Sequence, residues 1–80
     1  MRIDKFLKVS RIIKRRTVAK EACDLGRVEI GGRVVKAGAE VSPGDEITVH
    51  FGKNDLKVRV RSLAESTKKE DAADMYEVLS

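Results

Sequence analysis

Lysine and arginine are the residues of this chain whose number and spacing point to a chemical task, which is the binding of phosphate groups. Residues 1–36 carry eleven Lys or Arg and four acidic residues, a net charge of +7. Residues 37–80 carry six basic and nine acidic residues, a net charge of −3. Clustered positive charge favours binding to nucleic acid, because neutralising phosphates releases condensed counterions. A solvated basic face is the alternative interpretation.

The candidate RNA-binding residues lie near the start of the chain, where they must mostly be exposed because isolated charges are rarely buried. They are Arg2, Lys5, Lys8, Arg11, Lys14, Arg15, Arg16 and Lys20. Their mutual repulsion would be relieved by a polyanionic partner. Arg15 and Arg16 also lie near the expected start of a helix, where backbone N–H groups favour a phosphate.

Residues that could carry catalysis or bind a metal are few and isolated. His50 has no carboxylate or nucleophile near it in sequence, so a surface histidine is expected. Cys23 is the only cysteine, and a small core residue is the favoured interpretation. Asp4 is expected to cap a helix or to pair with a nearby arginine. No catalytic arrangement, phosphate loop or ligand cluster is present in the sequence. We therefore expect no enzymatic activity, no cofactor and no metal site.

Composition limits the mode of binding. The chain has 80 residues, which is one domain with a small core. Its only aromatic residues are Phe6, Phe51 and Tyr76, too few to supply stacking platforms for single strands. Recognition of structured RNA or DNA through phosphates and shape is therefore favoured. No apolar run is long enough to span a bilayer and no secretory signal is visible, so a cytoplasmic protein without a membrane partner is expected.

The first 26 residues are typical of a helix, a basic turn and a second helix. Ile3, Phe6 and Leu7 have the spacing of a helical core stripe. Residues 10–16 interrupt this pattern with four basic residues. A second helix is expected to begin with Thr17 as its N-cap and to end at Gly26. Its buried stripe is expected to consist of Val18, Ala22 and Leu25, with Ala19 beside them.

A period of two then indicates strands. Expected strands cover residues 28–30, 34–35, 47–51 and 56–61. Gly31-Gly32 is a hairpin turn signal, and Ser42-Pro43-Gly44-Asp45 is a tight turn. The last strand alternates an apolar face with Lys57, Arg59 and Arg61, which we interpret as a solvated face rather than a second RNA site.

The end of the sequence is typical of a helix. Thr67 and Glu70 have capping-box spacing, and an apolar stripe of Ala72, Met75, Tyr76 and Leu79 follows. The expected fold class is α+β, with the first two helices packed on a small, mostly antiparallel sheet and a C-terminal helix. Residues 1–62 would form the RNA-binding domain, and residues 63–80 a helical extension packed on it.

Several strings together resemble the RNA-binding domain named after ribosomal protein S4, with its αL RNA-binding motif. They are Arg2–Leu7, Ser10–Thr17, Ala19, Gly26–Val28, Gly32, Lys36 and Pro43–Asp45. Within that family the chain is most similar to the heat-shock-protein-fifteen group, and there to the short RqcP type. One difference is Gly31-Gly32, where the family often has Asn-Gly. Both dipeptides accept the positive φ of such a turn.

This resemblance implies a task on the ribosome. The implied partners are the rRNA of a large ribosomal subunit and the peptidyl-tRNA in its P-site. An RqcH-type factor on the same subunit would add C-terminal alanine tails to the stalled chain, and this protein would support it as a monomer. The family's basic contact motif matches Arg2, Arg11, Lys14, Arg15 and Arg16, with Lys5, Lys8 and Lys20 as weaker matches.

Other functions stay open at this point. A general rescue factor for stalled subunits and a ribosome-assembly RNA binder would carry the same basic face. A helix–turn–helix module for duplex DNA is a further alternative. An RNA-modifying enzyme would need a separate catalytic subunit, and binding by a protein adapter would survive nuclease treatment.

Overall fold

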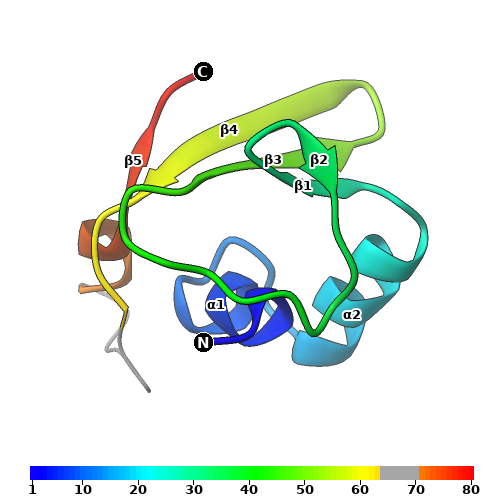
Figure 1. Cartoon of the computed structure of the whole chain (residues 1–80), viewed down its shortest axis with the longest axis horizontal. Helices are drawn as coiled ribbons and strands as arrows, with labels where there is room; N and C mark the ends of the chain where they lie inside the picture. Colours follow the sequence, from blue (N-terminus) through cyan, green and yellow to red (C-terminus); the bar gives the residue numbers. More distant parts are fainter. Residues whose placement is uncertain (64–70) are drawn as a thin grey trace.

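The computed structural model describes residues 1–63 and 71–80. In these residues five strands form one antiparallel sheet in the order β2-β1-β3-β4-β5. The elements are α1 (Ile3–Val9), α2 (Arg16–Asp24), β1 (Val28–Ile30), β2 (Arg33–Val34), β3 (Glu46–Phe51), β4 (Asn54–Val60), a 3₁₀ helix η1 (Ala72–Met75) and β5 (Tyr76–Val78). Helices α1 and α2 lie on one side of the sheet (Figure 1). The expected α+β class is confirmed.

Helix α1 is built as its sequence predicts. Ile3, Phe6 and Leu7 are completely buried in the core. The loop between β2 and β3 runs beside the start of the helix and caps it with backbone groups. The N–H of Ile3 donates to the Ala39 carbonyl at 2.8 Å, and the N–H of Asp4 donates to the Ala37 carbonyl at 3.3 Å. The loop thereby satisfies two of the donors that a helix N-terminus leaves open.

Helix α2 begins earlier than expected and buries a different face. Arg15 rather than Thr17 is the N-cap residue. The buried residues are Ala19 and Cys23, whereas Val18 is 46% exposed and Leu25 is 67% exposed. Ala19 is buried as expected and Ala22 packs against the core, whereas the two larger residues of the predicted stripe face solvent.

The end of α2 agrees with the sequence pattern. Gly26 has a φ of +75°. Its N–H donates to the carbonyl of Cys23 at 3.0 Å, and the N–H of Arg27 donates to the carbonyl of Ala22 at 2.9 Å. These two bonds form a Schellman motif, which requires a left-handed residue where the glycine lies.

The predicted hairpin and turn are both present. Gly31 and Gly32 have φ values of 59° and 84° and join β1 to β2, with Ile30 paired to Arg33. Gly44 has a φ of 94° in the Pro43 turn. Positive φ at these glycines gives each turn its direction.

The core lies between the helices and the inner face of the sheet. Val28, Ile47, Val49, Val58 and Val60 are each at most 2% exposed. The strand residues between them form the outer face, because successive side chains point to opposite sides of a sheet. The outer face therefore lies on the side of the sheet opposite α1 and α2.

The expected C-terminal α-helix is not found in residues 71–80. Ala72 and Met75 are buried, but they lie in a 3₁₀ helix. Tyr76 then starts β5, which pairs with β4 through Val60. A spacing of three fits a 3₁₀ helix as well as an α-helix, and the strand satisfies backbone groups of β4 that would otherwise form an edge. The predicted capping box, Thr67 and Glu70, lies outside the described residues.

Candidate nucleic-acid interface

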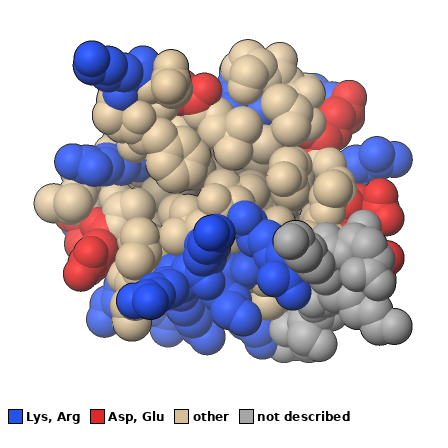
Figure 2. Space-filling model, turned by 180° about the vertical axis from the view of Figure 1, so that it is seen from behind, with Lys and Arg blue, Asp and Glu red and all other residues tan. Residues whose placement is uncertain are grey.

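The sequence-predicted binding residues come together on one side of the molecule. We name this surface the helical basic face: Arg2, Lys5, Lys8, Arg11, Lys14, Arg15, Arg16 and Lys20. All eight belong to α1, α2 or the backbone directly before and between them. Lys5 is half-buried and the others are exposed. Figure 2 shows Lys and Arg side chains gathered along the lower part of the molecule, the side on which Figure 1 places α1 and α2.

A buried carboxylate lies beneath this face. Asp4 is 3% exposed. Nε of Arg2 lies 3.3 Å from Oδ1 of Asp4, and Nη2 of Arg16 lies 3.4 Å from the same oxygen. Nη2 of Arg2 also donates to Oδ2 at 3.3 Å. The expected pairing of Asp4 with an arginine is confirmed, and the structure adds a second arginine from the other helix.

The end of α1 has an unusual backbone conformation that sequence reasoning missed. Arg11 has a φ of 63°, and its N–H donates to the carbonyl of Lys8 at 3.0 Å. A residue with a Cβ loses about 1–2 kcal/mol in this left-handed region. The sequence has neither Gly nor Asn at this position, the two residues that usually indicate a left-handed helix end. The turn therefore keeps an arginine side chain on the helical basic face at a conformational cost.

The outer face of the sheet has a different electrostatic character. Lys57 lies 3.5 Å from Glu46, and Arg59 lies 3.6 Å from Glu46 and 3.8 Å from Glu77. Lys57 and Arg59 are therefore paired with acids, which supports the interpretation of a solvated face, whereas Arg61 lies directly after the end of β4.

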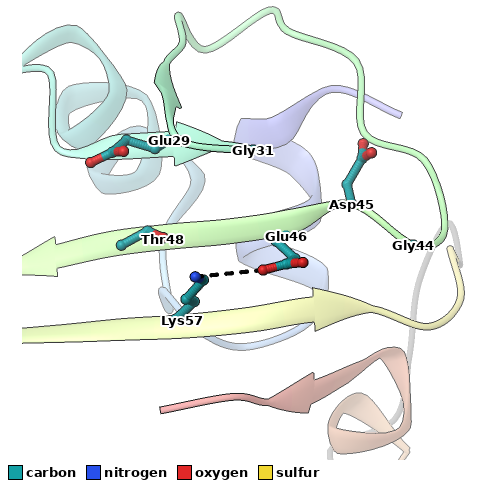
Figure 3. Close-up of a pocket in the computed structure, with 8 residues that line it drawn as sticks. Glu29, Gly31, Gly44, Asp45, Glu46, Thr48 and Lys57 are labelled. Atoms are coloured by element: carbon teal, nitrogen blue, oxygen red, sulfur yellow. Dashed lines mark ion pairs between the residues drawn. The ribbon is translucent and has the colours of Figure 1, made fainter.

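A shallow pocket on this side of the sheet is acidic (Figure 3). It is lined by Glu29, Gly31, Gly32, Gly44, Asp45, Glu46, Thr48 and Lys57. Three carboxylates and one lysine make it a poor site for phosphate, because like charges repel. This side of the sheet therefore adds no support for a second nucleic-acid site.

His50 lies at the surface, as expected, but it has two acidic partners that its position in the sequence did not indicate. Its Nδ1 contacts Asp55 at 2.7 Å, and its Nε2 contacts Glu29. The hydrogen bond to Glu29, followed by that to Asp55, raises the pKa of His50 above its ordinary value of 6.5. Two carboxylates therefore do lie beside this histidine, and the pairing of β1 with β3 brings Glu29 to it from far away in sequence.

Cys23 is a core residue, as expected. It is fully buried, and burial followed by the charges of Asp4 and Asp24 raises the pKa of the thiol to about 11. The part of the chain that the structure describes holds no cluster of His, Cys, Asp and Glu able to bind a metal ion. Among the same residues, no helix is long and apolar enough to cross a membrane.

Known proteins share both the sequence and the fold of this chain. Residues 1–47 match the family model described as the S4 domain. The RQC P-site tRNA stabilizing factor of Bacillus subtilis is 58% identical over 79 residues, which cover 99% of this chain and 92% of that protein. The Streptococcus pneumoniae protein of the same name is 52% identical over 80 residues, covering 100% of this chain and 91% of that protein.

A solved structure shows the same architecture. The trimeric structure of Vibrio cholerae Heat Shock Protein 15 matches with a TM-score of 0.92 at 23% identity, covering 100% of this chain and 82% of that one. This likeness concerns the fold, whereas the family follows from the matched sequences. The chain belongs to the S4-domain family, and within it to the family of the RQC P-site tRNA stabilizing factors.

Proposed function

We propose that this protein binds large ribosomal subunits that carry peptidyl-tRNA, and that it stabilises the P-site tRNA during ribosome-associated quality control. The observation that carries the proposal is the helical basic face, which gathers eight Lys and Arg residues from the segment around α1 and α2. The relatives named RQC P-site tRNA stabilizing factor, similar over the whole chain, support the choice of partner.

The proposed mode of action is binding without catalysis. Exposed guanidinium and ammonium groups would contact phosphates of rRNA and tRNA, which fixes position without reading base sequence. Affinity should therefore depend steeply on salt and little on base identity. The ion-paired outer face of the sheet would point away from the nucleic acid.

The finer parts of the proposal concern the setting. We place the protein in the cytoplasm as a monomer, beside an RqcH-type factor that adds alanine tails to the stalled chain. The resemblance to the RqcP type supports this setting. In it, a small basic protein that contacts both rRNA and tRNA would keep the tRNA in place through successive rounds of elongation without the small subunit.

Sedimentation of a tagged version from cells tests the proposal. We expect the protein to comigrate with free large subunits that carry peptidyl-tRNA, and to leave them after puromycin-type release or nuclease treatment. Absence from every ribosomal fraction would contradict the proposal. Binding that persists after nuclease treatment would indicate a protein adapter instead.

A purified system tests the tRNA part separately. Large subunits with and without a P-site tRNA are incubated with the protein, and bound protein is measured after sedimentation. We expect tighter binding to the tRNA-loaded subunits, and faster loss of that tRNA when the protein is omitted. Equal binding to both kinds of subunit would favour a general rRNA binder, such as an assembly factor.

A further inference from the structure

The carboxylate of Asp4 lies beneath the helical basic face and contacts arginines from two different segments. We propose that Asp4 is a positioning residue that holds the guanidinium groups of Arg2 and Arg16 together as one phosphate-binding pair. This inference rests on the proposed function and deepens it, because it names the residue that gives the RNA-binding surface its geometry.

The contacts leave both arginines able to bind a ligand. Arg2 approaches Asp4 through Nε and Nη2, and Arg16 through Nη2. A guanidinium carries five N–H donors, so donors remain on each arginine after these contacts. The side chains of Arg2 and Arg16 are 50% and 47% exposed, whereas that of Asp4 is 4% exposed. The buried carboxylate therefore holds the two guanidinium groups from below, and the outer sides of these groups face solvent.

The carboxylate itself is firmly placed. The backbone N–H of Lys5 donates to Oδ1 of Asp4 at 2.8 Å, and the N–H of Asp4 donates to the carbonyl of Ala37. Gly38 lies beside Arg2: a Cβ built on it would be 3.9 Å from Nη2 of that arginine. Helix α1 and the β2–β3 loop thus fix Asp4, and the loop passes beside the Arg2 guanidinium.

Charge alone does not explain an acid at this place. A negative charge inside a basic face weakens the long-range attraction of a polyanion, so a purely electrostatic interface would bind more tightly without Asp4. Two guanidinium groups that share one carboxylate oxygen, in contrast, are held close despite their repulsion. Preorganisation of this kind lowers the entropy lost on binding.

Long-range attraction and preorganisation predict opposite changes in affinity when the charge of Asp4 is removed. Asp4→Asn preserves the shape of the side chain and raises the net charge by one. The matched control Asp24→Asn raises the net charge equally, at an exposed residue of α2. We expect Asp4→Asn to weaken binding to tRNA-loaded large subunits on the order of tenfold, because charge-assisted contacts are lost. Asp24→Asn should bind as tightly as the wild type or more tightly. Asp4→Asn binding as tightly as Asp24→Asn would overturn the proposal.

A second set of variants replaces arginine with lysine, a substitution that leaves the total charge unchanged. Arg2→Lys and Arg16→Lys remove the planar fork, and Arg59→Lys on the outer face of the sheet serves as the control. We expect each of the first two to weaken binding about tenfold and Arg59→Lys to have little effect. In the Asp4→Asn background, Arg16→Lys should add no further loss. Failure of the wild type to bind would overturn the proposed function. If the wild type binds and Arg2→Lys and Arg16→Lys bind with the same affinity, only the proposed role of Asp4 would be overturned.

Discussion

Arg16 and Asp4 are twelve residues apart in sequence, yet Nη2 of the arginine lies 3.4 Å from Oδ1 of the aspartate. The contact joins the first turn of α2 to the first turn of α1. It places a long, basic side chain from the second helix next to Arg2, which precedes the first helix. Two arginines of the helical basic face therefore share one buried carboxylate.

Removal of either arginine of this pair should abolish stable binding to the large subunit. We expect Arg2→Ala and Arg16→Ala each to weaken binding at least tenfold and to lower the salt slope by about 1, because a phosphate contact is lost. Each variant should still unfold cooperatively, since Asp4 keeps its other arginine. Binding measured by sedimentation over a salt series, with thermal unfolding in parallel, checks both expectations.

The matched control for these variants is Arg59→Ala on the outer face of the sheet. It also removes one positive charge, but from a residue paired with Glu46 and Glu77. Its binding should remain close to that of the wild type. A loss as large as that of Arg16→Ala would mean that total charge, rather than the helical basic face, determines binding.

The double variant Arg2→Ala/Arg16→Ala should be less stable than the two single variants together predict. Asp4 would then be a buried carboxylate without either arginine, although the N–H of Lys5 would still donate to it. The loss of hydrogen bonds to a charged group costs about 1.5–3 kcal/mol. Urea unfolding of the wild type, both single variants and the double variant measures this coupling. Adding Asp4→Asn to the double variant should restore part of the loss, and an additive series without such recovery would contradict the expected role.

Local signals in the sequence were sufficient for most of the fold. The spacing of Ile3, Phe6 and Leu7 places all three on one face of a helix. Gly31-Gly32 can adopt the positive φ values that a two-residue hairpin turn requires. The end of the chain was predicted wrongly because Ala72 and Met75 fit two kinds of helix. The choice of strand for Tyr76 depends on the free edge of β4, which is distant in sequence.

The candidate site was predictable in composition but not in geometry. Exposure of the basic residues follows from the cost of burying charge, so the eight positions could be named. The face that α2 buries was predicted only in part, since Ala19 and Cys23 are buried as expected whereas Val18 and Leu25 are exposed. The pairing of Asp4 with Arg16 and of His50 with Glu29 depends on tertiary contacts that no local pattern encodes.

The stabilising contribution of His50 should decrease as the pH rises. Its contacts with Glu29 and Asp55 raise the pKa in the folded state above the unfolded value of 6.5. The contribution is therefore fully present below pH 6.5 and is lost as the pH rises through the folded-state pKa. The Tm difference between the wild type and His50→Gln should be larger at pH 6 than at pH 9. An equal difference at both pH values would contradict this role.

Cys23 should be unreactive in the folded protein. The raised pKa of about 11, against an ordinary value of 9.0, lowers the thiolate fraction at pH 8 by about a hundredfold. Its side chain is also fully buried. A thiol reagent at pH 8 should modify the native protein far more slowly than the protein in urea, as mass spectrometry would measure. Similar rates in both conditions would mean that α2 opens readily from the core.

The β1–β2 turn offers a test of backbone conformation that is separate from binding. Gly31 has a φ of 59°, and among the described residues no neighbouring heavy atom lies within 4 Å of a Cβ placed there. Gly31→Asn should raise the free energy of unfolding by about 0.5 kcal/mol, because Asn accepts this φ and restricts the unfolded chain. Gly31→Val meets the same open space but should cost about 1–2 kcal/mol, because a β-branched side chain strongly disfavours this φ whereas Asn tolerates it. Urea unfolding measures both. Equal stability of the two variants would mean that the turn relaxes to another conformation, since space alone does not distinguish them.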